Sequence, residues 1–217
     1  MTADTLEWRR FFVGLDLGKA RDYTAVAVVE QASYQVGERS PVDYRRRTVV
    51  RHAVRMLERM PLGTAYPDVA RRVGRIVRGV RAEGWCALVV DATGVGAPVV
   101  DLLRRGGLGC GMTAVTITGG ERKTAAAGGW RVPKKDLVAG LAVMLEEGRL
   151  RVARRMRWAE EFEEELKNMR VKVTGRGREQ YGAWGEGQHD DLVMAVALAC
   201  WKSGGERGIG MGNRRVV

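Results

Sequence analysis

Aspartate stands beside an apolar, core-like segment at three places in this sequence. Those places are, in chain order, Asp16, Asp91 and the pair Asp190 and Asp191. Asp16 lies between two leucines at the end of the apolar run 11–17, and alternation along a strand puts it on the face opposite both leucines. A carboxylate in such a setting needs a hydrogen-bond partner, a cation or a metal ion to offset the cost of its desolvation.

Several carboxylates gathered in one place indicate a divalent metal centre. They repel one another unless a cation neutralises them, and their hard oxygens favour Mg²⁺ or Mn²⁺ over Zn²⁺. The cysteines and histidines form no Cys–His pairs that would indicate zinc instead. Two hard ions about 4 Å apart activate a water molecule and stabilise the leaving oxygen of a phosphodiester. If the folded sheet brings the four aspartates to one face, they therefore predict phosphodiester hydrolysis.

Each aspartate also has a purely structural explanation. Asp16 and Asp91 could each cap the turn that follows a strand, and either Asp190 or Asp191 could cap the helix that they begin. We favour Asp191 as the direct metal ligand, with Asp190 capping the helix or holding the metal through water. His189, in the loop before this pair, is an auxiliary candidate, and a solvated turn residue is its structural alternative.

The charge of the chain is strongly positive, with 37 Lys and Arg against 26 Asp and Glu and a formal net charge of +11. This balance suits a polyanionic partner, and we expect nucleic acid and no membrane, because no apolar run approaches spanning length. A generally basic surface without a binding role is the alternative. The expected phosphate contacts lie in a Gly-rich loop and at a hairpin tip: Arg122, Lys123, Arg131, Lys134, Lys135, Arg176 and Arg178.

Apolar periodicity predicts the elements that must position these side chains. The predicted strands are 11–17, 25–31, 46–55, 87–90, 112–118 and 150–153, with a further hairpin of 171–174 and 179–184. The predicted helices cover 67–83, a segment from about 97, 133–147, 158–169 and 190–201. Segments 32–44 and 118–131 are predicted loops, and 56–66 a connector.

Together these elements predict an α/β fold in which a mixed sheet is flanked by helices. The last helix is apolar all round, so we expect it to be buried. One domain should span 11–202, preceded by an extension at 1–10 and followed by a flexible tail at 203–217. The three cysteines lack CxxC spacing and no signal peptide is visible, which favours reduced thiols in a cytoplasmic protein.

Four motifs follow one another from about Phe11 to Trp201: GLDLGKARDYTA, VVDATGVGAPVVDLL, ITGG…GGWRVPKKDLV and YGAWGEGQHDDLVMAVALACW. Their order resembles the nuclease domain of large terminase subunits, which belong to the DNA-packaging motors of tailed bacteriophages and prophages. The resemblance implies a ribonuclease H-like fold and a Mg²⁺- or Mn²⁺-dependent endonuclease that cuts concatemeric double-stranded DNA. Little sequence specificity is expected, because phosphate contacts position DNA without reading its bases.

The same resemblance assigns roles and partners. Its metal acids correspond to Asp16, Asp91 and the Asp190–Asp191 pair, and it implies Asp22 as a nearby auxiliary. It implies a packaging ATPase domain, a small terminase and a portal as partners, and the cytoplasm of the bacterial host as the location. The chain has no G-x-x-x-x-G-K-[ST] phosphate loop. We therefore expect an isolated nuclease domain or a split gene product, which cuts DNA and does not translocate it.

Other protein classes share parts of this pattern. A Holliday-junction resolvase or a ribonuclease H would use the same metal chemistry and is the nearest alternative. A sugar-kinase-like or actin-like ATPase also pairs a GLDLG hairpin with a later turn such as DATGVG at 91–96, but it needs two such domains, and 217 residues are too few. A DNA-binding module without catalysis is disfavoured because every acid is present.

Overall fold

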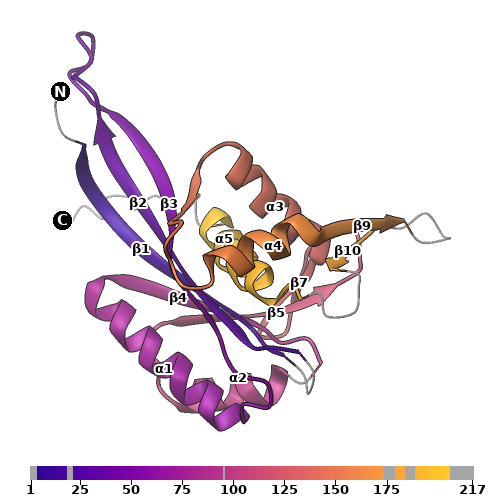
Figure 1. Ribbon diagram of the computed structural model, residues 1–217. Coiled ribbons are helices and arrows are strands. Elements are labelled where there is room, and N and C mark those ends of the chain that lie inside the picture. The colour runs from indigo at the N-terminus through magenta and orange to yellow at the C-terminus, as the bar shows by residue number, and fades with distance from the viewer. Residues whose placement is uncertain (1–3, 19–21, 95, 174–178, 184–188, 206–217) are drawn as a thin grey trace.

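The computed structural model describes residues 4–18, 22–94, 96–173, 179–183 and 189–205 (Figure 1). The strands of its main sheet are β1 (Thr5–Asp16), β2 (Ala25–Val36), β3 (Arg47–Arg59), β4 (Trp85–Asp91), β5 (Gly111–Thr118), β6 (Thr124–Ala126), β7 (Gly129–Pro133) and β8 (Leu150–Val152). A separate hairpin joins β9 (Met169–Val173) to β10 (Glu179–Ala183). The helices are α1 (Tyr66–Glu83), α2 (Gly96–Arg105), α3 (Lys134–Glu146), α4 (Ala159–Asn168) and α5 (Asp191–Gly205).

The order of the strands brings the predicted acids to one edge of the sheet. That order is β6-β7-β5-β4-β1-β2-β3-β8, in which β1, β4, β5 and β7 run parallel to one another. Leu15 pairs with Val90, so Asp16 and Asp91 come next at the carboxyl ends of neighbouring strands. The segment after β5 and the start of α3 after β7 lie at the same edge. The mixed sheet flanked by helices confirms the predicted α/β fold.

Helices cover both faces of the sheet, as Figure 1 shows, with α1 and α2 on one side and α3, α4 and α5 on the other. Alternation along β1 serves both layers, because Phe12 packs into the core beneath α5 while Val13 packs into the core beneath α1. Helix α5 is buried from Asp191 to Cys200, as its all-apolar sequence predicts. None of the helices in the described part of the chain is long and apolar enough to cross a membrane.

One glycine lets α5 approach β1 very closely. A Cβ atom added to Gly14 would lie 1.9 Å from the backbone oxygen of Ala195 and 3.1 Å from the backbone nitrogen of Ala199. The strand and the helix are therefore in direct backbone contact at this point. Because Gly14 precedes Asp16 by two residues, the contact sets how far Asp16 lies from the start of α5.

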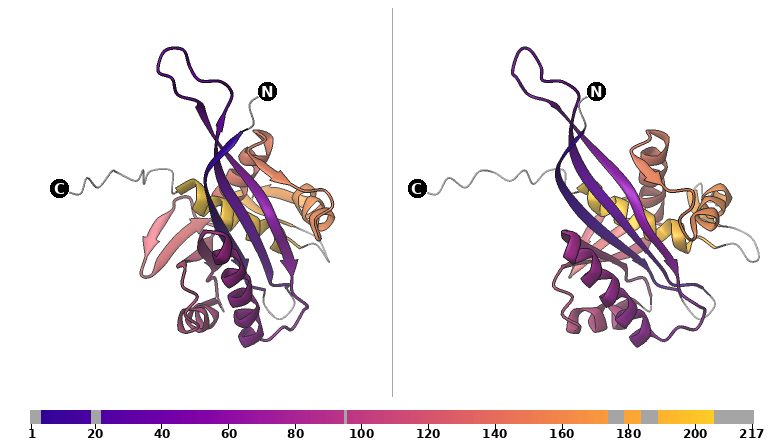
Figure 2. Two further views of the ribbon diagram at one scale, coloured as in Figure 1. Left: turned by 90° about the vertical axis from the view of Figure 1, so that its left-hand side faces the viewer. Right: turned by 60° about the vertical axis from the view of Figure 1, so that its left-hand side comes forward.

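Two predicted loops and the predicted connector are partly wrong. Residues 32–36 continue β2, where Ser33 and Gln35 donate hydrogen bonds to the carboxylate of Glu7 on β1 at 2.7 and 2.9 Å. Strand β3 likewise runs on to Arg59, so β1, β2 and β3 form the long ribbon that projects from the body in Figures 1 and 2. The predicted loop 118–131 contains β6 and the start of β7.

The misassigned glycine in that loop has a packing role. Gly129 pairs with Ala114 of β5, and a Cβ atom at Gly129 would lie 2.2 Å from the backbone oxygen of Ala114. The residue permits a close strand approach and does not break the strand. The remaining predicted elements are confirmed with shifted ends, including the helix that Pro67 opens and Gly84 ends and the β9–β10 hairpin.

Candidate metal centre

The structure brings the four predicted aspartates together. Asp16 ends β1 and Asp91 ends β4, and a side-chain hydrogen bond links the two carboxyl groups. Asp190 and Asp191 begin α5, which packs across β1. Burial raises the pKa of Asp16 well above its usual value, and the negative charges of Asp91, Asp190 and Asp191 raise it further. The protonated form of Asp16 is therefore favoured in the metal-free fold.

Asp91 also performs the turn-capping role that its position predicts. Its Oδ1 accepts hydrogen bonds from the backbone N–H of Thr93 at 2.8 Å and from the Thr93 hydroxyl. The Thr93 oxygen in turn accepts the backbone N–H of Ile117 at 2.8 Å, which ties the end of β4 to β5. Burial still raises the pKa of Asp91, although the bonds from Thr93 oppose that shift. The cap holds Asp91 rigidly without removing it from the acidic cluster.

Two cations neutralise the pair of aspartates at the start of α5. The Lys134 ammonium donates to Asp190 Oδ2 at 2.6 Å. Arg59 donates from Nε to Asp191 Oδ2 at 2.8 Å and from Nη2 to Asp191 Oδ1 at 3.2 Å. Burial raises the pKa of Asp191, and the hydrogen bonds from Arg59 oppose the shift. Both cations compensate charges that the fold has gathered.

Behind Asp191 lies a second buried carboxylate, which sequence reasoning missed. Glu165 of α4 binds Arg59 Nη2 and accepts the backbone N–H of Val193 at 3.0 Å. Its burial raises the pKa of Glu165 to about 8, and the charge of Asp191 contributes. Helical spacing could have identified it, because Glu165 follows Phe162 by three residues and shares its buried face. Arg59 fell in the predicted connector, where the sequence offers no comparable signal.

The two auxiliary candidates differ in their surroundings. Asp22 is exposed. The His189 ring packs edge-on against Tyr23 with 4.9 Å between ring centroids, and its charge acts to lower the pKa of Asp191. His189 thus lies near Asp191.

The predicted phosphate contacts divide into several groups. Arg122 and Arg131 are exposed. Lys134 points inward to Asp190, Lys135 binds Glu121, and Lys123 lies over the Trp130 ring at 4.9 Å. Arg176 and Arg178, at the predicted hairpin tip, lie outside the described residues. The segment 119–123 follows β5 at the acidic edge of the sheet, which is where a bound backbone would need positive charge.

The donor set suits a hard divalent cation. Its ligand atoms are carboxylate oxygens. Burial first, and then the negative charges of the other three aspartates, raise the pKa of Asp16, and a bound cation would offset both effects. Within the described residues, no three His, Cys, Asp or Glu side chains already meet closely enough to enclose an ion. Lys134 and Arg59 bind two of the acids, and a hydrogen bond links Asp16 to Asp91. The residues therefore fit a metal in identity, and a bound cation would favour the ionised form of Asp16.

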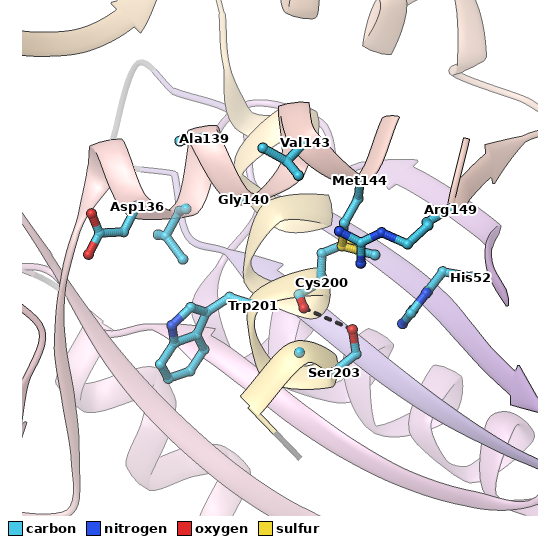
Figure 3. Close-up of a pocket in the computed structure, with 12 residues that line it drawn as sticks. His52, Asp136, Ala139, Gly140, Val143, Met144, Arg149, Cys200, Trp201 and Ser203 are labelled. Atoms are coloured by element: carbon cyan, nitrogen blue, oxygen red, sulfur yellow. Dashed lines mark hydrogen bonds between the residues drawn. The ribbon is translucent and has the colours of Figure 1, made fainter. Parts of the chain in front are cut away.

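A cavity of about 390 Å³ lies at the opposite end of α5, between α3 and β3 (Figure 3). Its lining is largely apolar and includes Val143, Met144 and Trp201, with His52 at one side. About nine residues of α5 separate it from Asp191, which is roughly 14 Å along a helix. This cavity is therefore not part of the acidic site.

Comparisons with known proteins agree with this fold. A family model described as the terminase RNaseH-like domain matches residues 13–202. The large terminase nuclease from thermophilic phage G20c with bound magnesium is similar at 24% identity and a TM-score of 0.62, over 92% of this chain and 84% of that one. The human cytomegalovirus terminase nuclease domain is similar at 14% identity and a TM-score of 0.53, over 88% and 82%.

The nuclease domain of the large terminase subunit gp2 of bacterial virus Sf6 is also similar, at 14% identity and a TM-score of 0.51, over 90% of this chain and 89% of that one. No curated protein sequence matches the chain. At these identities the structural likeness is one of fold. It confirms the ribonuclease H-like architecture that the sequence predicts.

Proposed function

The chain belongs to the terminase RNaseH-like domain family, and we propose that it is a metal-dependent endonuclease that cuts concatemeric double-stranded DNA during genome packaging. The observation that carries the proposal is the convergence of Asp16, Asp91, Asp190 and Asp191 at the carboxyl ends of two parallel strands and the start of a buried helix. Similar nuclease structures hold magnesium in the phage G20c protein and manganese in the Sf6 protein, which supports a divalent ion here.

Each residue of the cluster has a distinct task in this proposal. Asp16, Asp91 and Asp191 hold the metal, of which two ions are expected, and Asp190 holds it through water or caps α5. When bound, such ions activate water and stabilise the leaving oxygen of the phosphodiester. Asp16 must be ionised to bind a metal ion. The hydrogen bond from the Thr93 N–H fixes the position of the Asp91 carboxylate. A metal ion that bound Asp190 would displace the Lys134 ammonium from that carboxylate.

Positive charge outside the cluster would hold the DNA. The exposed side chains of Arg122 and Arg131 flank the acidic edge, and contacts from them to phosphates position a duplex without reading bases. The packaging ATPase domain, small terminase and portal stay predicted partners, and the host cytoplasm stays the predicted location.

Plasmid cleavage tests the proposal directly. We expect nicking and linearisation with Mg²⁺ or Mn²⁺, none with EDTA, and none for Asp16→Asn in any buffer. The Asp16→Asn protein should still fold, because an amide among carboxylates removes repulsion and can donate to Asp91. Full activity in chelator would disprove the metal chemistry. Preference for a four-way junction or an RNA–DNA hybrid over linear duplex would favour the resolvase or ribonuclease H alternative.

The pH dependence of stability gives a second check on the same variant. The pKa of Asp16 is raised in the folded protein, so the folded state binds its proton more tightly than the unfolded state does. Metal-free protein should therefore lose stability as the pH rises above the usual aspartate pKa and through the raised one. Thermal melts of Asp16→Asn should show less of this loss. If Asp16→Asn and the wild type lose stability equally as the pH rises, Asp16 is not the group whose raised pKa causes the loss.

A further inference from the structure

Side chains from other segments surround the guanidinium of Arg59. Its guanidinium binds both oxygens of Asp191 and one oxygen of Glu165. The rings of Tyr23 and Trp158 cover it, with 4.8 and 5.5 Å from the guanidinium carbon to the ring centroids. Only 11% of the Arg59 side chain is exposed. Four separate segments, β3, the 22–24 loop, α4 and α5, thus meet on one guanidinium.

The backbone at Trp158 is strained in a way that serves this enclosure. Trp158 has a φ of +67°, in the left-handed region that residues other than glycine rarely adopt. Such a conformation is unfavourable for a residue with a side chain and persists where surrounding contacts require it. Here it allows the residue before α4 to lay its ring over Arg59. The left-handed backbone at Trp158 thus accompanies a cation–π contact that helps to fix the guanidinium.

Arg59 and Lys134 differ in how firmly each is held. Lys134 is 28% exposed and makes one hydrogen bond to Asp190, which is itself 25% exposed. The Arg59 and Asp191 side chains are 11% and 6% exposed, and moving Arg59 would break its bonds to Glu165 as well. Lys134 can therefore yield to an incoming cation, whereas Arg59 stays in place.

Asp191 can bind a metal without releasing Arg59. A carboxylate offers about four lone-pair positions, and Arg59 uses one on each oxygen. The backbone N–H of Asp191 also bonds to this carboxylate, so at least one position remains for a metal. The two hydrogen bonds from Arg59 fix the plane of the carboxylate, and Glu165 fixes Arg59 in turn. A correctly oriented ligand is thereby present before any metal arrives.

We propose that Arg59 is a positioning residue of the metal centre, which holds the Asp191 carboxylate oriented for metal through a guanidinium clamped by Glu165, Tyr23 and Trp158. The proposal rests on the proposed function, in that Asp191 is taken to be a metal ligand. It predicts that Arg59 assists metal binding. The opposite outcome, in which Arg59 competes with the metal for Asp191, is equally measurable.

Manganese affinity of the whole chain, measured by calorimetry, tests the proposal without DNA. Outer partners of metal ligands typically contribute 10- to 100-fold in affinity, so we expect Arg59→Ala to weaken Mn²⁺ binding about tenfold or more. Millimolar guanidinium should restore much of the affinity, because it fits the clamp, whereas methylammonium at the same concentration should not. Arg157→Ala is the matched control, since Arg157 is exposed and contacts the same Trp158 ring at 5.4 Å, and its Mn²⁺ affinity should equal that of the wild type.

A conservative variant covers the case in which Arg59→Ala does not fold. Arg59→Lys keeps the charge but loses the fork that grips both oxygens, so its affinity should also fall. Unchanged or tighter Mn²⁺ binding in the folded variants would overturn the proposal. Wild-type protein that binds Mn²⁺ but never cuts DNA would refute the proposed function while leaving the Arg59 comparison valid. Wild-type protein that binds no Mn²⁺ would refute both.

Discussion

Replacing Gly14 with alanine should move the aspartates of α5 away from Asp16 on β1. The added Cβ atom would lie 1.9 Å from the Ala195 oxygen, about 1.5 Å short of an ordinary contact of 3.4 Å. Both contacted atoms are backbone atoms, so no side-chain rotation can make room. Helix α5 must therefore move away from β1 by on the order of 1 Å or more, and Asp191 moves with it, away from Asp16.

The expected cost appears in both stability and rate. Overpacking of this kind costs about 1–3 kcal/mol of unfolding free energy, and a misplacement of about 1 Å can reduce a catalysed rate about 100-fold. Urea denaturation measures the first and Mg²⁺-dependent plasmid nicking the second. The nicking assay should be run at a temperature where circular dichroism shows the variant to be folded.

A second glycine provides the control for Gly14→Ala. Gly140 lies in α3, where its added Cβ atom would meet nothing within 4 Å, so Gly140→Ala should raise stability by about 0.5–1 kcal/mol and leave nicking unchanged. If Gly14→Ala cuts DNA at the wild-type rate, the backbone contact between β1 and α5 does not set the geometry of the site, and the reasoning fails.

Three further outcomes are expected. Asp190→Asn should retain some nicking, because asparagine can also cap a helix, whereas Asp191→Asn should retain none; the reverse order would exchange the two roles. Iodoacetamide should label Cys110 at a rate that rises through pH 7, because a hydrogen bond from the Cys86 thiol lowers the pKa of Cys110 to about 7. Peptide mass spectrometry across pH 5–9 measures this labelling, and a labelling midpoint near pH 9 would contradict the expectation. Neutralising Arg122 and Arg131 together should weaken binding to all duplex sequences alike and reduce the salt slope by about one per lost phosphate contact; an unchanged slope would place both away from DNA.

The acidic centre was predictable because strand ends carry strong sequence signals. Asp16 and Asp91 follow unbroken apolar runs, and the carboxyl ends of parallel neighbours meet at one edge of a sheet. The burial of α5 followed from its apolar circumference. Both predictions depend on local pattern alone.

The partners of the acids were not predictable in this way. Arg59 reaches Asp191 only because β3 is longer than its pattern indicates and because α4 folds back beside it. The sequence around Lys134 predicts a surface cation, yet the turn from β7 into α3 directs its side chain to Asp190. These contacts join residues far apart in the chain. Their register is decided by packing, which a single sequence does not display.

The position of α5 in the chain has a consequence for how the enzyme is made. This helix is the last described element, yet it fills the centre of one core layer and contacts β1, β2, β3 and β4. During synthesis the early strands therefore lack the helix that fills the centre of this layer until the segment that ends at Gly205 has left the ribosome. Asp16, synthesised before α5, meets Asp191 only then. An incomplete chain consequently lacks an assembled acidic centre, and cutting activity should appear only with the finished fold.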